Sequence, residues 1–315
     1  MTTRRQFLQW TGGGAAAALT LGSSLAGSGA TAGLSSSAEN TVGQANRGTP
    51  AKDIATGQRA AKPHGEQTFA LGLASYSLRN LPLGQALAIT NRLGLKHICL
   101  NPAHLPVAST PAHIAEVAAR VKAAGIDLYG AGVIYMRKPA DVDRAFEYAR
   151  AAGIRIMVAA PSPGVLPLVD EKVKKYDLRV AIHNHGPGDK SYPTPQAVYE
   201  KIKNLDRRIG LCIDIDHTTR AGVDPSRAAE QFADRLLDVH MRDVTAATPK
   251  GEPIEAGHGV IDIPKFLRTL ERIRYAGVVA FEFEKDPADP VPGLAESVGY
   301  VRGALAALAF SFASG

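Results

Sequence analysis

Leu211-Cys212-Ile213-Asp214-Ile215-Asp216-His217 begins as an apolar run and turns polar at Asp214, and three other segments make the same change. These segments are Val180-Ala181-Ile182-His183-Asn184-His185, Leu237-Asp238-Val239-His240-Met241-Arg242-Asp243 and Val279-Ala280-Phe281-Glu282-Phe283-Glu284. An apolar, β-branched run is typical of a strand buried in a parallel sheet. Where such strands lie side by side, their polar ends meet at one edge, and imidazole and carboxylate groups gathered there could hold a divalent metal.

Strand-like and helical patterns alternate along the chain from Phe69 onward. The strand-like runs are Phe69–Ser75, His97–Asn101, Asp127–Ile134, Ile154–Ala160, Arg179–Asn184, Ile209–Ile215, Leu237–Met241 and Val278–Phe283. Apolar residues spaced by three and four predict helices between them, among them Pro111–Ala124, Ala140–Ala152, Gln196–Leu205 and Ile263–Tyr275. Eight such units in roughly 245 residues predict an α/β fold, the (β/α)8 TIM barrel, with active residues at the carboxyl ends of the strands. An open doubly wound sheet is the rival, but no Gly-rich phosphate loop follows an early strand.

Threonine, proline and glycine mark the ends of the predicted helices. A capping hydroxyl precedes a first-turn proline at two of them, Thr110-Pro111 and Thr194-Pro195. Gly125, Gly153 and Gly277 each follow a predicted helix, and we expect each glycine to take the left-handed conformation that ends a helix.

The first residues resemble a twin-arginine export signal. Thr3-Arg4-Arg5-Gln6-Phe7-Leu8 carries the arginine pair, and a short Ala/Gly-rich apolar stretch follows it. Small-residue cleavage sites follow Ala26, Ala30 and Ala32, and the last of these sets the predicted signal at residues 1–32. Residues 33–66 are rich in Ser, Ala, Gly, Thr and Asn without an apolar period, which predicts a disordered linker before a barrel over 67–315. We expect a periplasmic or secreted protein; a chance arginine pair and an uncleaved anchor are the alternatives.

The composition is ordinary for a globular protein, with 45% hydrophobic and 21% charged residues. The net charge is +6, and removing Arg4 and Arg5 with the signal leaves +4. Basic residues are scattered, so charge does not support nucleic-acid binding, and we expect no membrane association beyond the signal. Cys99 and Cys212 fall in strands far apart around the predicted barrel, which favours buried free thiols over a disulfide. A homo-oligomer is compatible with the sequence.

Three phrases, in order along the chain, resemble the xylose isomerase-like TIM-barrel superfamily of sugar isomerases and epimerases. Its strand-six phrase Asp-x-Gly-His corresponds to Asp214-Ile215-Asp216-His217, and its strand-seven phrase His-x-Lys-Asp corresponds to His240-Met241-Arg242-Asp243. Its strand-eight glutamate corresponds to Glu282. The resemblance runs from about Phe69 to Leu308 and implies a small-molecule sugar or keto-sugar as the substrate.

In that family one divalent cation, often manganese, is held by four residues at strand ends. The resemblance therefore implies Asp214, His240 and Glu282 as metal ligands, with zinc, cobalt or magnesium as other options for the metal. At the place of the family's strand-five glutamate this chain has His183, which could still bind the metal through a ring nitrogen. The family's epimerases use two glutamates as acid and base. Because His183 replaces one of these glutamates, the two-glutamate mechanism does not carry over to this chain unchanged.

The chemistry expected of such a site is proton transfer on a bound sugar. A cation that bridges a carbonyl and an adjacent hydroxyl stabilises the enediolate left when a neighbouring C–H proton is removed. We expect Glu282 or His183 to handle that proton as the catalytic residue, and His185, His217 and Arg242 to contact the substrate. Return of the proton to the next carbon is isomerisation, and return to the opposite face is epimerisation.

Each residue also has a plain structural alternative. These are a core histidine for His183, a helix cap for Asp214, a half-exposed strand end for His240, an ion pair with Arg242 or Lys285 for Glu282, and a loop role for His258.

Two other functions stay open, and a third is disfavoured by the sequence. A lyase or hydratase would eliminate from a keto-sugar or keto-glycoside in the same barrel, and a histidine at position 183 could protonate the leaving oxygen. An apurinic endonuclease would need further histidines after strands two and three, where Asn101 and the run Asp127–Ile134 supply none. A non-catalytic periplasmic sugar-binding barrel is the other open function.

Overall fold

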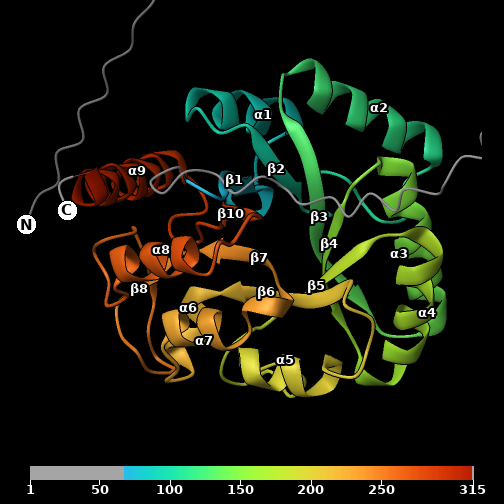
Figure 1. Ribbon diagram of the computed structural model, residues 1–315. Helices are drawn as coiled ribbons and strands as arrows, with labels where there is room; N and C mark the ends of the chain where they lie inside the picture. Colours follow the sequence, from blue (N-terminus) through green and yellow to red (C-terminus); the bar gives the residue numbers. More distant parts are fainter. Residues whose placement is uncertain (1–66, 314–315) are drawn as a thin grey trace, which may run out of the picture. The chain divides into compact units, whose positions relative to one another are not determined.

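A computed structural model of the protein describes residues 67–313. Eight parallel strands close into a barrel in the order β1-β10-β7-β6-β5-β4-β3-β2, as Figure 1 shows. They are β1 (Ala70–Ala74), β2 (His97–Leu100), β3 (Asp127–Met136), β4 (Ile156–Pro161), β5 (Arg179–His183), β6 (Ile209–Asp214), β7 (Leu236–Met241) and β10 (Val278–Phe281). The predicted TIM barrel is confirmed. The predicted signal and linker lie outside the described residues.

Helices cover the outside of the barrel (Figure 1). They are α1 (Leu83–Arg92), α2 (Pro111–Ala123), α3 (Pro139–Ala152), α4 (Leu166–Tyr176), α5 (Pro195–Ile202), α6 (Ile215–Arg220), α7 (Pro225–Gln231), α8 (Ile263–Arg272) and α9 (Val291–Ala313). A two-stranded antiparallel hairpin, β8 (Asp243–Val244) with β9 (Pro253–Ile254), follows β7. Within residues 67–313, no helix combines the length and apolar character that a membrane span needs.

Helix ends follow the predicted chemistry in most places. The Thr110 side chain accepts a hydrogen bond from the His113 N–H, and Gly125 and Gly153 have φ of +69° and +66°. The prediction that Gly277 ends the last of these helices in the left-handed conformation is wrong. Helix α8 ends at Arg272, earlier than predicted, and Arg274 takes the left-handed conformation with φ +54°. Gly277 has a different role, because a Cβ there would collide with the ring of Tyr275.

Strand register aligns some of the polar strand ends and offsets others by two residues. Asp214 on β6 pairs with His240 on β7, and His183 on β5 pairs with Cys212 on β6. Ala181, Cys212 and Ala280, one from each of three strands, belong to one buried core cluster. Both cysteines are buried and free, as predicted.

Candidate metal centre

Four side chains converge at the carboxyl ends of neighbouring strands. His183 ends β5, Asp214 ends β6, His240 lies near the end of β7, and Glu282 directly follows β10. All four are buried, and one donor atom of each lies within 4.8 Å of the donor atoms of the other three. The structure thus brings together the four residues that the sequence predicted as ligands.

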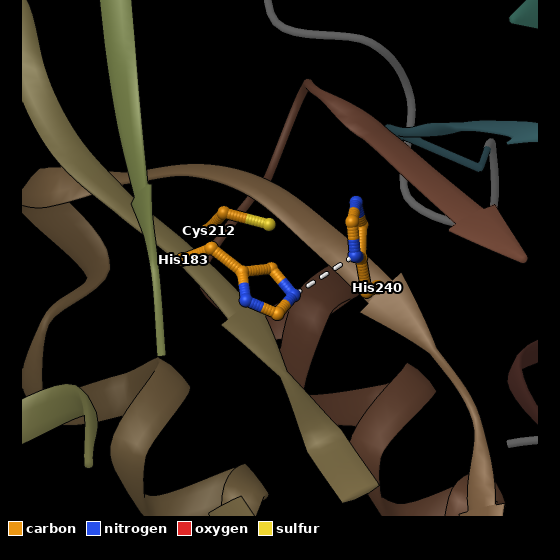
Figure 2. A group of neighbouring side chains, drawn as sticks. All are labelled: His183, Cys212 and His240. Atoms are coloured by element: carbon orange, nitrogen blue, oxygen red, sulfur yellow. Dashed lines mark hydrogen bonds between the residues drawn. The ribbon is translucent and has the colours of Figure 1, made fainter. Parts of the chain in front are cut away.

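The contacts among these donors fit a single metal ion. His183 Nε2 lies 3.1 Å from His240 Nδ1 (Figure 2) and 3.5 Å from Asp214 Oδ2. His240 Nδ1 lies 3.1 Å from Glu282 Oε2. Nitrogen and oxygen ligands sit about 2.0–2.2 Å from a zinc ion, so donors about 3–3.5 Å apart suit a shared ion. The other ring nitrogens, His183 Nδ1 and His240 Nε2, are buried without a hydrogen-bond partner among the described residues.

Asp214 is held in place from two sides. Its Oδ1 accepts a hydrogen bond from the His217 N–H at 2.8 Å and so caps α6, as the structural alternative for this residue anticipated. Its backbone N–H donates to Asn184 Oδ1 at 3.1 Å, and Asn184 Nδ2 donates to Thr218 Oγ1 at 3.1 Å. Capping leaves Oδ2 facing the cluster, so the helix-cap and ligand roles of Asp214 are compatible. The part of Asn184 in fixing the ends of β5 and β6 was not predicted.

Arg242 lies among four carboxylates. Its Nη1 is 3.0 Å from Asp214 Oδ2 and 3.4 Å from Glu282 Oε2. Its Nη2 is 2.9 Å from Glu284 Oε2 and 3.3 Å from Asp216 Oδ2. Only 3% of the Arg242 side chain is exposed. The guanidinium therefore balances the charge of the two carboxylate ligands, and its predicted contact with substrate stays a prediction.

Neighbouring charges decide which carboxyl groups are ionised. Burial alone would raise the pKa of Glu282, but the positive charges of His240 and Arg242 outweigh it and hold this pKa at about 2. Burial likewise opposes ionisation of Asp214, and Arg242 nevertheless keeps the Asp214 pKa well below its usual range. For Asp216 burial dominates and raises the pKa to about 7. Asp214 and Glu282 are thus ionised at neutral pH, as metal ligands must be.

The histidines divide by environment. Burial lowers the pKa of His183, and it lowers the pKa values of His185 and His217 to about 4. Burial would lower the pKa of His240 too, but the negative charge of Glu282 raises it to about 9. Three neutral imidazoles therefore face one protonated imidazole at neutral pH.

His185 and His217 lie beside the cluster. Their ring centroids are 4.6 Å and 5.8 Å from that of His183. His185 Nε2 is 3.2 Å from the hydroxyl of Tyr135, whose ring stacks on the imidazole and is 53% exposed. Tyr135 was missed because the strand was predicted to end at Ile134, whereas β3 continues to Met136. An aromatic residue just beyond a predicted strand end was the available signal.

Other candidates have structural partners. Lys285 pairs with Glu255 at 2.9 Å rather than with Glu282. His258 pairs with Glu296 at 2.7 Å on the surface, which fits its loop role.

Comparisons with known proteins agree with this architecture. Residues 135–304 match the family model described as xylose isomerase-like TIM barrel. Residues 1–22 match the twin-arginine translocation signal sequence, which indicates export, as predicted. Among curated proteins, the rhizopine catabolism protein MocC of Rhizobium meliloti is 26% identical over 157 residues. That match covers 45% of this chain and 48% of MocC, so it spans about half of the relative.

Solved structures with similar folds extend over most of the barrel. The IolI protein with a binding zinc atom has a TM-score of 0.63 at 16% identity, covering 75% of this chain and 98% of IolI. An L-ribulose 3-epimerase has a TM-score of 0.61 at 16% identity, covering 78% and 97%. The probable 3-DHS dehydratase AsbF from Bacillus anthracis has a TM-score of 0.59 at 10% identity, covering 74% and 99%. At these identities the likeness concerns the fold alone.

Proposed function

The chain belongs to the xylose isomerase-like TIM-barrel family, and from that premise we propose that it is a metal-dependent isomerase or epimerase of a small sugar or keto-sugar. The observation that carries the proposal is the convergence of His183, Asp214, His240 and Glu282 within 4.8 Å at the strand ends. Two imidazoles and two carboxylates suit manganese, zinc or cobalt, and manganese is the metal we expect. The export signal directs the activity to the periplasm or beyond the cell.

A divalent cation bound to these four residues would polarise a substrate carbonyl and an adjacent hydroxyl, which acidifies the neighbouring C–H bond. The chain's own residues then manage charge and protons. Arg242 keeps Asp214 and Glu282 ionised through contacts at 3.0 Å and 3.4 Å. His185 and His217, neutral at pH 7, can donate to or accept from sugar hydroxyls beside the cluster.

His183 and Glu282 are the candidates for the proton transfer. His183 is neutral because burial lowers its pKa, and its Nδ1 has no hydrogen-bond partner among the described residues. It can therefore accept a proton from a carbon atom held within reach. Glu282 is ionised and can also accept a proton, but its Oε2 is already bonded to His240 and Arg242.

A lyase or dehydratase is the second candidate. The strand-five position carries the imidazole of His183 rather than a carboxylate, and once it has accepted the substrate's proton this imidazole can donate it to a leaving hydroxyl. A probable dehydratase shares the fold. Elimination would begin with the same proton removal, so the metal centre serves both reactions.

Proton NMR in deuterated water against a panel of ketoses and keto-glycosides tests the proposal. We expect metal-loaded protein to exchange the proton next to the carbonyl; an isomerised product supports the first candidate, and vinylic signals support the second. Glu282→Gln with metal retained should abolish the exchange if Glu282 is the base. Glu284→Gln is the matched control and should keep it. Metal-loaded protein that binds sugars without exchange or turnover would instead be a sugar-binding barrel.

A further inference from the structure

A thiol lies beside the two imidazoles of the metal centre. Cys212 Sγ and one ring nitrogen each of His183 and His240 all lie within 4.8 Å of one another. Figure 2 shows the three side chains, with the thiol of β6 directed into the barrel next to the two rings. The histidines are thus shared between two donor sets, one completed by Asp214 and Glu282 and the other by Cys212.

We propose that Cys212, His183 and His240 form an inner binding position for a thiophilic divalent cation such as Zn²⁺, Co²⁺ or Cd²⁺. The inference rests on the proposed metal centre, because it uses the same two imidazoles. Coordination forms a sulfur–metal bond and breaks the S–H bond, and the proton leaves to solvent. Carboxylate oxygens are hard donors and thiolate is a soft one, so the two sets differ in the metals they prefer.

The spacing of the donors supports an inner position. Zinc binds sulfur at about 2.3 Å and nitrogen at about 2.0–2.1 Å, so at the tetrahedral angle a sulfur and a nitrogen on one ion lie about 3.6 Å apart. Because the donor atoms lie within 4.8 Å of one another, a side-chain movement of about 1 Å or less brings them to that spacing. His240 Nε2, which lacks a hydrogen-bond partner in the described part of the chain, supplies unused donor capacity.

Strand geometry places this position deeper in the barrel than the outer set. Cys212 precedes Asp214 by two residues and faces the same side of β6, about 6.6 Å lower along the strand. Its register partners are His183 on β5 and the buried Asp238 on β7, and the core cluster around it includes Ala181 and Val158. Cys212 is fully buried, so an ion held there is closed off from solvent, as structural zinc sites are. A thiophilic metal is thereby drawn away from the substrate side.

Absorption spectroscopy of the Co²⁺-loaded full barrel tests the proposal, because thiolate bound to Co²⁺ gives a strong near-ultraviolet charge-transfer band. We expect the band in the wild type and in Cys99→Ser, the matched control for a second buried free thiol in the inner barrel. Cys212→Ser should lack the band, and its Cd²⁺ affinity should fall by about tenfold or more. Its Mn²⁺ affinity should change little, because manganese uses the carboxylate set.

Two results would overturn the proposal: Co²⁺ binding in the wild type without a thiolate band, or a band that persists in Cys212→Ser. Either one leaves the proposed enzyme function intact, whereas failure of folded wild type to bind Co²⁺ and Mn²⁺ removes both. Should Cys212→Ser not fold, X-ray absorption of zinc-loaded wild type decides, since sulfur among the zinc neighbours supports the inner position and its absence refutes it.

Discussion

Replacing Arg242 by methionine tests the electrostatic design of the centre. The substitution keeps much of the side-chain volume but removes a guanidinium that lies within 3.4 Å of the carboxylates of Asp214, Asp216, Glu282 and Glu284. Removing one partner of a buried ion pair costs about 3–5 kcal/mol, because the remaining charge is left uncompensated. We expect Arg242→Met to lose about that much unfolding free energy at neutral pH, a large part of a typical total of about 5–15 kcal/mol.

Urea denaturation with and without Mn²⁺ is the assay. A divalent cation supplies the positive charge that the variant lacks, so metal should stabilise Arg242→Met more than it stabilises the wild type. Arg235→Met is the matched control: Arg235 is equally buried, but it donates to backbone carbonyls, including those of Asp206 at 2.9 Å and Ile209 at 2.8 Å. The control should be destabilised without this additional gain from metal. An Arg242→Met protein as stable as the wild type, or equal metal stabilisation of both variants, would refute the reasoning.

Three further outcomes are expected. Glu282 raises the pKa of His240 to about 9, so a metal ion that binds at neutral pH must displace a proton from His240. The Mn²⁺ affinity should therefore rise about tenfold per pH unit up to that pKa and then level off. Calorimetric titration across that pH range checks this, and an affinity that does not change with pH contradicts it. Asn184→Ala should cost about 1–3 kcal/mol in denaturation experiments, because it leaves the buried backbone N–H of Asp214 without its acceptor; an unchanged midpoint would rule that out. Tyr135→Ala should raise KM more than it lowers kcat, since the Tyr135 hydroxyl lies beside His185. Because the side chain is 53% exposed, the free energy of unfolding should change by less than about 0.5 kcal/mol. A large loss of stability would show a structural role instead.

The carboxyl ends of the strands were predictable because the change from apolar to polar residues marks where a buried parallel strand leaves the sheet. Parallel strands carry apolar runs, and the first polar residue after each run marks the carboxyl end. That rule located His183, Asp214 and Glu282, and the barrel brings their donor atoms within 4.8 Å of one another and of His240.

What the sequence could not give depends on side-chain direction and on contacts between distant elements. The enclosure of Arg242 by four carboxylates joins residues of β6, α6, the end of β7 and the segment after β10, and no local pattern reports it. The end of α8 was misplaced because Arg274, rather than a glycine, takes the left-handed conformation. Non-glycine residues adopt it rarely, so composition gives little warning.

Metal content of the purified, dialysed protein tests the central claim most directly. After incubation with Mn²⁺, wild type should retain one equivalent of metal per chain, while folded Asp214→Asn and His240→Ala should retain almost none. Glu284→Gln, a carboxylate outside the donor set, should bind like the wild type. Folded wild type without metal, or full retention in His240→Ala, would contradict the assignment of these strand ends as a metal centre.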